Sequence, residues 1–453
     1  MEKKRLSFKD TILVAGTLFG MFFGAGNLIF PVHLGQLAGK NIIPAIIGFV
    51  ITAVGIPILG VAAIGVTHSD GLGELSGKVG KRYSYFFTCI LYLTIGPFFA
   101  IPRCATTSFT TGIAPLLGEK INERYALLIF SFIFFALVLL FSLKPGKITV
   151  WIGGIINPLF LIFLAILVVA AFTGHSVDLS TLAPDGTYES GSFFSSFIEG
   201  YNTMDAIAGL AFGIIVVNII RRKGVENDSA VARDVLKSGV FSGLLMALIY
   251  VLTVIMGARS LGFTSLSENG GIAIAEIAKH YLGSFGSIVL AATITLACLK
   301  TSIGLVTSCS ETFVKMFPRA FSYKVWAIIF TLFSFVISNV GLSAIIGYSV
   351  PVLMFIYPLA ITLIILAFVG GFFNHDRAIY ISVTALTLVA AIFDLINALP
   401  KNIISTLRLE AIIGLAEKYL PFYSIGLGWI IPAVVGFVIG LIIHFCQPKV
   451  SRV

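Results

Sequence analysis

The sequence has few charged residues and none of the motifs that common enzymes use. Asp, Glu, Lys and Arg make up 11% of the 453 residues, hydrophobic residues make up 58%, and the mean hydropathy is +1.02. A soluble globular domain has about 25% charged residues, so this composition excludes one. The chain also has no HExxH, GxSxG or CxxC pattern and no complete phosphate-binding loop. We therefore predict a membrane protein that is not an enzyme and binds no cofactor.

Cysteine is scarce, and its spacing shows no pairs. The five cysteines, Cys89, Cys104, Cys298, Cys309 and Cys446, all fall in or at the ends of apolar segments. This pattern is typical of small packing residues and argues against a disulfide framework or a zinc site.

Basic residues outnumber acidic ones, which gives a net charge of +9. Most of them fall on one side of the membrane if the chain begins in the cytoplasm, so the charge reflects topology and not nucleic-acid binding. The positive-inside rule then predicts two cytoplasmic ends and an even number of spans. The first apolar segment has no small-residue cleavage site and should remain in the mature protein.

Apolar runs long enough to cross about 30 Å of hydrocarbon recur along the whole chain. We expect about twelve transmembrane helices in a single all-α domain. The predicted segments are 11–37, 42–67, 84–116, 125–143, 148–173, 192–220, 235–258, 283–314, 324–340, 343–372, 378–399 and 424–446.

The first segment contains residues that are unusual inside a membrane helix. The stretch GMFFGAGNLIFP, residues 20–31, holds three glycines, an asparagine and a proline. Spacing by four at Gly16, Gly20 and Gly24 also fits close helix packing. That alternative does not explain Gly26 and Asn27, which suit an unwound segment followed by a new helix whose N-terminal N–H groups face an anion such as a carboxylate.

The sixth segment is interrupted in a similar way by Glu199, Gly200, Asn202, Thr203 and Asp205. Intramembrane acids pack against neighbours in some proteins, but they are more often functional. Five spans reverse the direction of the chain, so residues 192–372 can repeat residues 11–173 with inverted topology, leaving 378–446 as two peripheral helices. Interrupted helices at matching places in two halves indicate a transporter binding site.

Four motifs in the same order resemble those of the bacterial branched-chain amino acid:cation symporter family. They are FFGAGNLIFPVHLGQLAG in the first segment, GPFFAIPR in the third, GYNTMDAIAGLAFGIIVVN in the sixth and ACLKTSIGL in the eighth. The resemblance implies a LeuT-like fold of the amino acid, polyamine and organocation superfamily in the bacterial cytoplasmic membrane. It also implies inward transport of leucine, isoleucine and valine with sodium or protons.

The resemblance further implies which residues bind the substrate. The backbone of Phe23, Gly24, Ala25 and Gly26 would face the substrate carboxylate, with the Asn27 side chain beside a sodium ion or the substrate. Tyr201, Asn202, Thr203, Met204 and Asp205 would form the unwound part of the sixth helix, whose carbonyls suit an ammonium group.

Two charged residues at equal depth suggested a pair within this site. Counting inward from the outer surface places Arg103 and Asp205 about a dozen residues deep, where an isolated charge is costly. We expect them to be close partners beside the substrate, with the shallower Glu199 as the rival acid.

The eighth segment does not determine whether sodium or a proton is the coupling ion. Thr301 and Ser302 are similar to the adjacent hydroxyl ligands of a second sodium site in sodium-coupled relatives, but Lys300 departs from that pattern. The other candidate sodium ligands, at a first site, are Gly20, Phe23, Asn27 and Thr203. In one hypothesis the Lys300 amine replaces a sodium ion and the carrier is proton-coupled. In the favoured one, Lys300 is structural, pairing with an acid or extending toward the cytoplasm, and sodium binds near Asn27 and Thr203.

Asp394 lies outside both predicted repeats, and we interpret it as structural or interfacial. A channel is the alternative from another functional class, but paired broken helices favour alternating access over an open pore. The order of preference among the three substrates and the oligomeric state do not follow from the sequence.

Overall fold

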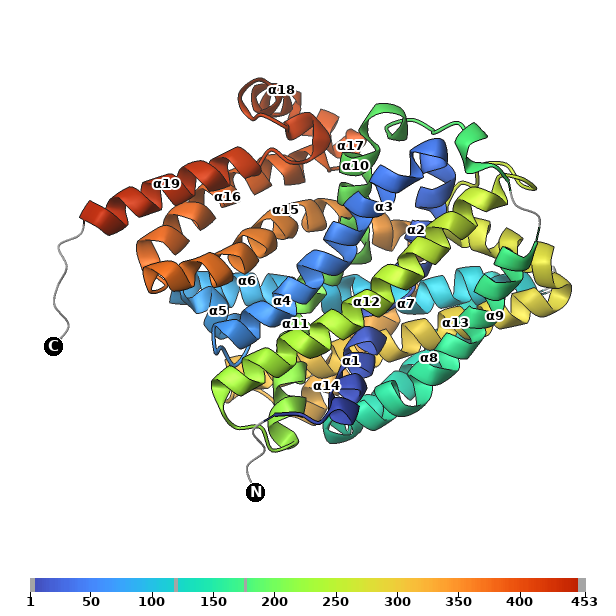
Figure 1. Ribbon diagram of the computed structural model, residues 1–453, viewed down its shortest axis with the longest axis horizontal. Helices are drawn as coiled ribbons and strands as arrows, with labels where there is room; N and C mark the ends of the chain where they lie inside the picture. The colour runs from blue at the N-terminus through green and yellow to red at the C-terminus, as the bar shows by residue number, and fades with distance from the viewer. Residues whose placement is uncertain (1–4, 118–120, 175–176, 447–453) are drawn as a thin grey trace.

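The computed structural model describes residues 5–117, 121–174 and 177–446, and over these residues all regular structure is helical. Figure 1 shows long helices lying side by side, with the C-terminal helices forming an arm at one edge. Five of the basic residues used for the topology prediction, Lys3, Lys4, Lys120, Lys449 and Arg452, lie outside the described residues.

The longer helices follow the predicted apolar segments. Their bounds are α1 Phe8–Phe22, α2 Gly26–Ala38, α3 Ile42–Val50, α4 Ile56–Val66, α6 Lys81–Leu93, α7 Ala100–Thr107, α8 Glu123–Ser142, α9 Asn157–Thr173, α10 Tyr188–Glu199, α11 Asp205–Arg222, α12 Asp228–Ser260, α13 Gly270–Met316, α14 Tyr323–Ser338, α15 Leu342–Val369, α16 Arg377–Asn397 and α19 Ile430–Cys446. Three short helices lie in loops: α5 Leu72–Gly77, α17 Lys401–Thr406 and α18 Glu410–Tyr419.

Several predicted spans are joined from more than one helical piece. Turns of π-helix connect α3 to α4, at Ile51–Gly55, and α6 to α7, at Thr94–Phe98. In the described part of the chain, eight helices are long and apolar enough to cross a membrane, or nine if the bent pair α10 and α11 counts as one span. The shorter α14 and α19 are also apolar. The total of twelve spans and the inverted repeat therefore stay predictions.

The first helix is interrupted in the glycine-rich stretch. α1 ends at Phe22, α2 begins at Gly26, and Phe23 has a non-helical backbone with φ −75° and ψ 86°. Pro31 lies inside α2 and has no N–H to donate to the carbonyl of Asn27 one turn earlier. The break thus leaves N–H groups at the start of α2 and carbonyl groups free to contact other partners.

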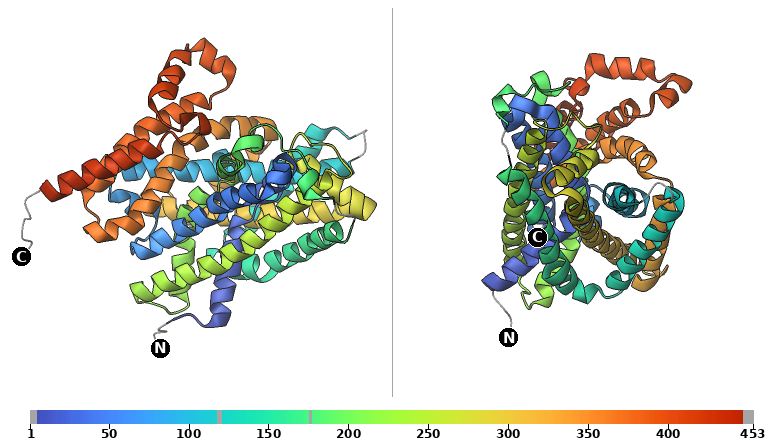
Figure 2. Two further views of the ribbon diagram at one scale, coloured as in Figure 1. Left: turned by 45° about the horizontal axis from the view of Figure 1, so that its top comes forward. Right: turned by 90° about the vertical axis from the view of Figure 1, so that its right-hand side faces the viewer.

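The second interruption separates α10 from α11. A 3₁₀ turn, η9 (Gly200–Thr203), is followed by Met204 in the left-handed conformation with φ 63°, and the two helices meet at an angle of 44°. Two further views show the C-terminal helices, in orange and red, at one side of the bundle formed by the earlier helices (Figure 2).

The start of α1 is fixed to two later helices. The Leu6 N–H donates to Asp234 Oδ2 on α12 over 2.9 Å, and Lys223 Nζ, just after α11, lies 2.6 Å from Asp10 Oδ1. These contacts connect the start of α1 to α12 and to the residue that follows α11.

Glycines allow some of the helices to touch along their backbones. A Cβ atom added at Gly257 of α12 would overlap the carbonyl oxygen of Val32 on α2, and one added at Gly35 would overlap the Val254 carbonyl oxygen. Backbone atoms cannot yield as a side chain does, so this helix pair requires glycine at both positions.

We predict that Gly257→Ala destabilises the protein by about 2 kcal/mol, because α2 and α12 must separate to admit a methyl group. Thermal unfolding in detergent measures this as a lower midpoint. Gly347→Ala in α15 is the matched control, since an added Cβ there meets no atom within 4 Å. An unchanged midpoint for Gly257→Ala would show that the helix contact is not tight.

Candidate functional site

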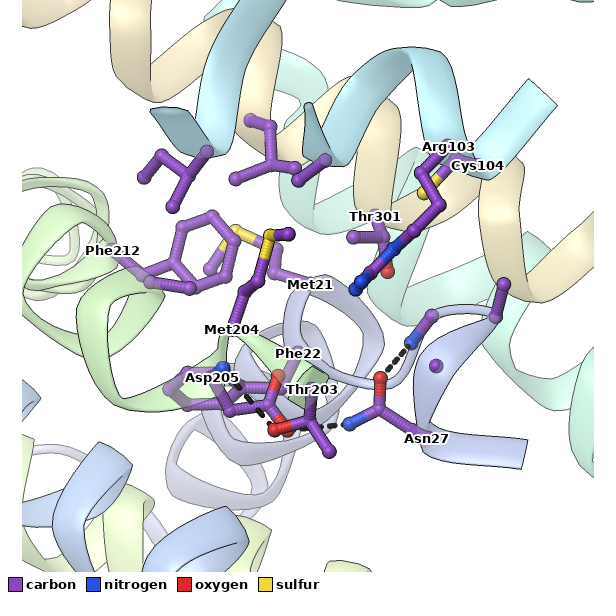
Figure 3. A pocket seen from close by; sticks show the side chains of 17 residues that line it. Met21, Phe22, Asn27, Arg103, Cys104, Thr203, Met204, Asp205, Phe212 and Thr301 are labelled. Atoms are coloured by element: carbon purple, nitrogen blue, oxygen red, sulfur yellow. Dashed lines mark hydrogen bonds between the residues drawn. The ribbon is translucent and has the colours of Figure 1, made fainter. Parts of the chain in front are cut away.

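Both helix breaks line one buried cavity together with α7 and α13. Its lining residues are Met21, Phe22, Gly24, Ala25, Gly26, Asn27, Ile95, Ala100, Arg103, Cys104, Thr203, Met204, Asp205, Ala208, Phe212, Thr301 and Leu305 (Figure 3). The cavity has a volume of about 30 Å³, which is room for about two water molecules. A larger ligand can enter only if the surrounding helices separate.

Asn27 connects the two breaks through its side chain. Its Oδ1 accepts the Gly24 N–H over 2.9 Å, and its Nδ2 donates to Asp205 Oδ2 and to the Tyr250 hydroxyl. The Tyr250 hydroxyl also donates to Asp205 over 3.1 Å. One buried amide therefore binds the unwound part of the first span, the start of α11 and α12.

Thr203 completes this network on the side of η9. Its hydroxyl donates to the Gly200 carbonyl over 2.9 Å and accepts the Asp205 N–H over 3.3 Å. Buried polar groups in a membrane need such partners, because water is absent there. The network thus explains how an interrupted helix can persist at this depth.

Arg103 and Asp205 line the cavity but do not pair. Among the described residues no ion pair joins them within 4.0 Å, and no hydrogen bond holds the Arg103 guanidinium. Arg103 points into the cavity, whereas Asp205 lies with Asn27 and Thr203 at another part of its wall (Figure 3). The expected direct pair is absent, because Asp205 is occupied by Asn27 and Tyr250.

The Arg103 guanidinium instead lies near the start of α2. Its Cζ is 5.7 Å from the centroid of the Phe30 ring, and a Cβ atom added at Gly26 would lie 3.3 Å from one of its terminal nitrogens. The side chain is only 6% exposed. A cation and the N-terminal end of a helix thus lie together, and both favour an anion. The rival acid, Glu199, accepts a hydrogen bond from Asn202 and does not line the cavity.

Apolar side chains cover the rest of the cavity wall. Met21, Phe22, Ile95, Phe212 and Leu305 come from four different helical segments, and Met204 adds a sulfur from the second break. The sequence analysis did not name these five as site residues. Some signal was available, because Ala208 and Phe212 follow Asp205 at helical spacing and so share its face of α11.

Nine of the residues predicted for the substrate or sodium line the cavity: Gly24, Ala25, Gly26, Asn27, Arg103, Thr203, Met204, Asp205 and Thr301. The others, Gly20, Phe23, Tyr201, Asn202, Ser302 and Lys300, do not. The Phe23 ring turns to Phe160 and Tyr250, and the Tyr201 ring stacks on Tyr357 with centroids 4.1 Å apart.

Lys300 is fully buried behind this cavity. Its Nζ lies 4.0 Å from the ring centroid of Phe160, 4.8 Å from that of Phe19 and 5.5 Å from that of Phe23. No hydrogen bond or ion pair joins this amine to any residue that the structure describes. A structural lysine was expected to extend toward the cytoplasm or to pair with an acid. Lys300 does neither.

The two hydroxyls after Lys300 also lack partners. Thr301 Oγ1 and Ser302 Oγ are buried and make no hydrogen bond within the described chain. Thr301 Oγ1 would lie 3.1 Å from a Cβ atom added at Gly24, so this hydroxyl faces the first break. Unpaired hydroxyl oxygens beside free backbone carbonyls are the ligand type that a hard cation prefers.

Comparison with known proteins identifies the family. The model of a family described as branched-chain amino acid transport protein matches residues 7–447. The chain belongs to this family. The family predicted from the four motifs is thereby confirmed. The protein is a multi-pass membrane transporter and not an enzyme.

Relatives resemble the chain over almost its full length. It is 48% identical to the branched-chain amino acid permease BrnQ of Lactobacillus delbrueckii subsp. lactis, with 96% of this chain and 97% of the relative covered. The permease BraB of Bacillus subtilis is 44% identical, with 97% of both chains covered. BrnQ of Escherichia coli strain K12 is 36% identical, with 97% and 96% covered.

Solved structures share the fold at low identity. A nucleobase-cation-symport-1 family transporter, Mhp1, closed with bromovinylhydantoin bound, matches 98% of this chain and 93% of its own with a TM-score of 0.62 and 15% identity. MhsT in complex with L-phenylalanine matches 98% and 99%, with a TM-score of 0.57 and 15% identity. The predicted LeuT-like fold is thereby confirmed.

We predict that Asn27→Ala raises the half-saturation concentration for the transported amino acid by at least about tenfold, because it leaves Asp205 and the Gly24 N–H without this partner. Initial uptake rates in proteoliposomes provide the measurement. Asn41→Ala is the matched control, since its amide bonds to the Tyr188 and Glu189 carbonyls outside the cavity. Wild-type affinity in a folded Asn27→Ala protein would contradict the role given to this amide.

Proposed function

We propose that the protein imports leucine, isoleucine and valine across the bacterial cytoplasmic membrane in symport with sodium. The observation that carries the proposal is the division of one buried cavity into a cationic part at Arg103, an anionic part at Asp205 and an apolar wall. An amino acid with an aliphatic side chain has three groups that complement these parts: a carboxylate, an ammonium group and an apolar side chain. The printed names of the relatives, branched-chain amino acid permeases, support this substrate class.

Arg103 and the N-terminus of α2 would bind the substrate carboxylate. An arginine in a membrane interior is costly without a counter-charge, and Arg103 has no ion-pair partner in the described chain. A carboxylate entering the cavity would supply that counter-charge. The guanidinium can donate two parallel hydrogen bonds, which fix the orientation of the carboxylate.

The second break would bind the ammonium group. Asp205 supplies negative charge there, and the Tyr201 to Met204 segment supplies backbone carbonyls. The side chain would then lie against Met21, Phe22 and Phe212. Burying a leucine side chain contributes about 1.5–3 kcal/mol, whereas a polar side chain there would lose its hydrogen bonds to water.

Sodium would bind between the first break and α13. Thr301 Oγ1 and Ser302 Oγ are available, and the break offers backbone carbonyls from Gly20 to Phe23. Asn27 and Thr203, the favoured ligands from sequence, use their side chains within the network instead, so Thr301 and Ser302 are the better candidates. This moves the proposed ion toward the second of the two sites we had considered.

Transport would follow by alternating access. The cavity is too small for leucine, so the helices on one side and then the other must separate around it. Contacts of Leu6 with Asp234 and of Lys223 with Asp10 would have to open on the cytoplasmic side. The N- and C-termini would both lie in the cytoplasm.

A proton-coupled carrier is the second candidate, and one observation favours it. The unpaired amine of Lys300 lies among three phenylalanine rings, which attract a cation by cation–π interaction. If this ammonium replaces sodium, the carrier would release and regain its proton during each cycle. The two kinds of coupling differ in which ion gradient drives uptake of the substrate.

We predict that a sodium gradient alone drives leucine uptake into proteoliposomes and that a proton gradient alone, in sodium-free buffer, does not. Lys300→Thr should keep its sodium dependence, because Thr301 and Ser302 remain. Uptake by the wild-type protein on a proton gradient in the absence of sodium would refute sodium coupling. Gain of sodium dependence only in Lys300→Thr would assign the cation role to the lysine.

We predict that Arg103→Gln weakens leucine transport by about a hundredfold in half-saturation concentration, since a charge-assisted bond is lost. Leucinamide lacks the carboxylate, so it should compete poorly with leucine in the wild type. Its residual inhibition should change little in Arg103→Gln. Arg259→Gln, which alters a second arginine near Phe172 and away from the cavity, is the control. Equal loss of leucine and leucinamide binding in Arg103→Gln would argue against contact with the carboxylate.

A further inference from the structure

Three helices meet at one carbonyl oxygen next to the apolar wall of the cavity. The Ala211 carbonyl of α11 accepts the Tyr92 hydroxyl of α6 over 3.2 Å and the Ser308 hydroxyl of α13 over 2.7 Å. All three residues are fully buried. We call Tyr92, Ala211 and Ser308 the three-helix node. The transport mechanism above does not use it.

Ser308 differs from other buried hydroxyl residues of the same helix. The Thr293, Thr307 and Ser310 hydroxyls each donate to the carbonyl four residues earlier in α13, over 2.7 to 2.8 Å. Such a local hydrogen bond satisfies a hydroxyl within its own helix. The Ser308 hydroxyl instead donates to α11, so its hydrogen bond connects two helices.

A second set of contacts joins α6 to α13. The Cys309 thiol donates to the Tyr92 carbonyl over 3.5 Å, and a Cβ atom added at Gly96 would lie 2.8 Å from the Cys309 sulfur. Gly96 has a non-helical backbone within the turn Thr94–Phe98, which joins α6 to α7. The kinked end of α6 is therefore fixed to α13 directly and to α11 through the Tyr92 hydroxyl.

Each helix of the node also contributes to the apolar wall of the cavity. Three wall residues lie three positions from a node residue: Ile95 from Tyr92, Ala208 from Ala211 and Leu305 from Ser308. Residues three apart in a helical segment share a face, so the wall and the node lie about one turn apart. Phe212, which follows the node residue of α11, lies at the end of the cavity away from Arg103 (Figure 3).

The node therefore fixes the distances between the helices that carry this wall. In a close-packed site, those distances decide which side chain fits. One extra or missing methylene in an apolar pocket changes discrimination by about 10- to 200-fold. A small change in the separation of α6, α11 and α13 would thus change which amino acids bind.

We propose that Tyr92 and Ser308 are positioning residues, which set the side-chain selectivity of the transporter by holding α11 against α6 and α13. Neither side chain lines the cavity, so both act through the wall residues on their helices. This inference rests on the proposed function, since the wall is the proposed site of the substrate side chain.

We predict that the double variant Tyr92→Phe with Ser308→Ala accepts larger side chains. The ratio of the inhibition constant of phenylalanine to that of leucine should fall about fivefold, because α11 is no longer held and the wall can widen. Each single variant should lower the ratio about twofold, since one hydroxyl remains on the carbonyl. Competition with uptake of radiolabelled leucine into proteoliposomes measures both constants.

Tyr83→Phe with Ser310→Ala is the matched control, because it removes hydroxyls from the same two helices. The buried Tyr83 hydroxyl has no hydrogen-bond partner in the described chain, and the Ser310 hydroxyl bonds within α13. This control should keep the wild-type ratio.

A ratio that stays the same or rises in the node variants would overturn the positioning role. Equal weakening of leucine and phenylalanine, which a purely structural role would cause, would also overturn it. If the double variant does not fold, the two single variants decide by the same measurement. Failure of the wild-type protein to take up leucine would instead overturn the proposed function itself, so the two failures are distinguishable.

Discussion

The absence of water from the membrane interior is the constraint on which the rest of this structure depends. A helix can be interrupted there only if other groups bind the backbone atoms that the interruption frees. This protein interrupts two helices beside one cavity and joins them through the Asn27 side chain, which holds the Gly24 N–H, Asp205 and Tyr250 together. The two breaks therefore stabilise each other, and the cavity lies where they meet.

Much of this architecture could be predicted from the sequence, because a helix that spans a membrane requires a long run of apolar residues. Long apolar runs predicted most of the helices, and Gly26, Asn27 and Pro31 indicated the place of the first break. The four motifs identified the family and, through it, the fold. Thr203 and Asp205 were chosen because polar residues are rare inside spans, and both line the cavity.

What could not be predicted depends on side-chain direction and on contacts between distant helices. Depth alone made Arg103 and Asp205 look like partners, but Asp205 is bound by Asn27 and by Tyr250, which lies 45 residues further along the chain. Similarly, Tyr201 lies in the second break, yet its ring stacks on Tyr357 and turns from the cavity. The apolar wall was missed because residues such as Phe212 resemble ordinary packing residues in an apolar sequence.

Two cations without ion-pair partners lie in different surroundings, and this difference suggests different roles. Arg103 points into the cavity beside the start of α2, so a substrate anion can reach it. Lys300 is buried among the rings of Phe19, Phe23 and Phe160, and it does not line the cavity. Phe19 is part of α1 and Phe23 follows it, so any movement of α1 during transport would change the environment of this amine. A cation whose surroundings change when the first helix moves is suited to respond to opening of the site, whereas one that faces the cavity is suited to bind the substrate.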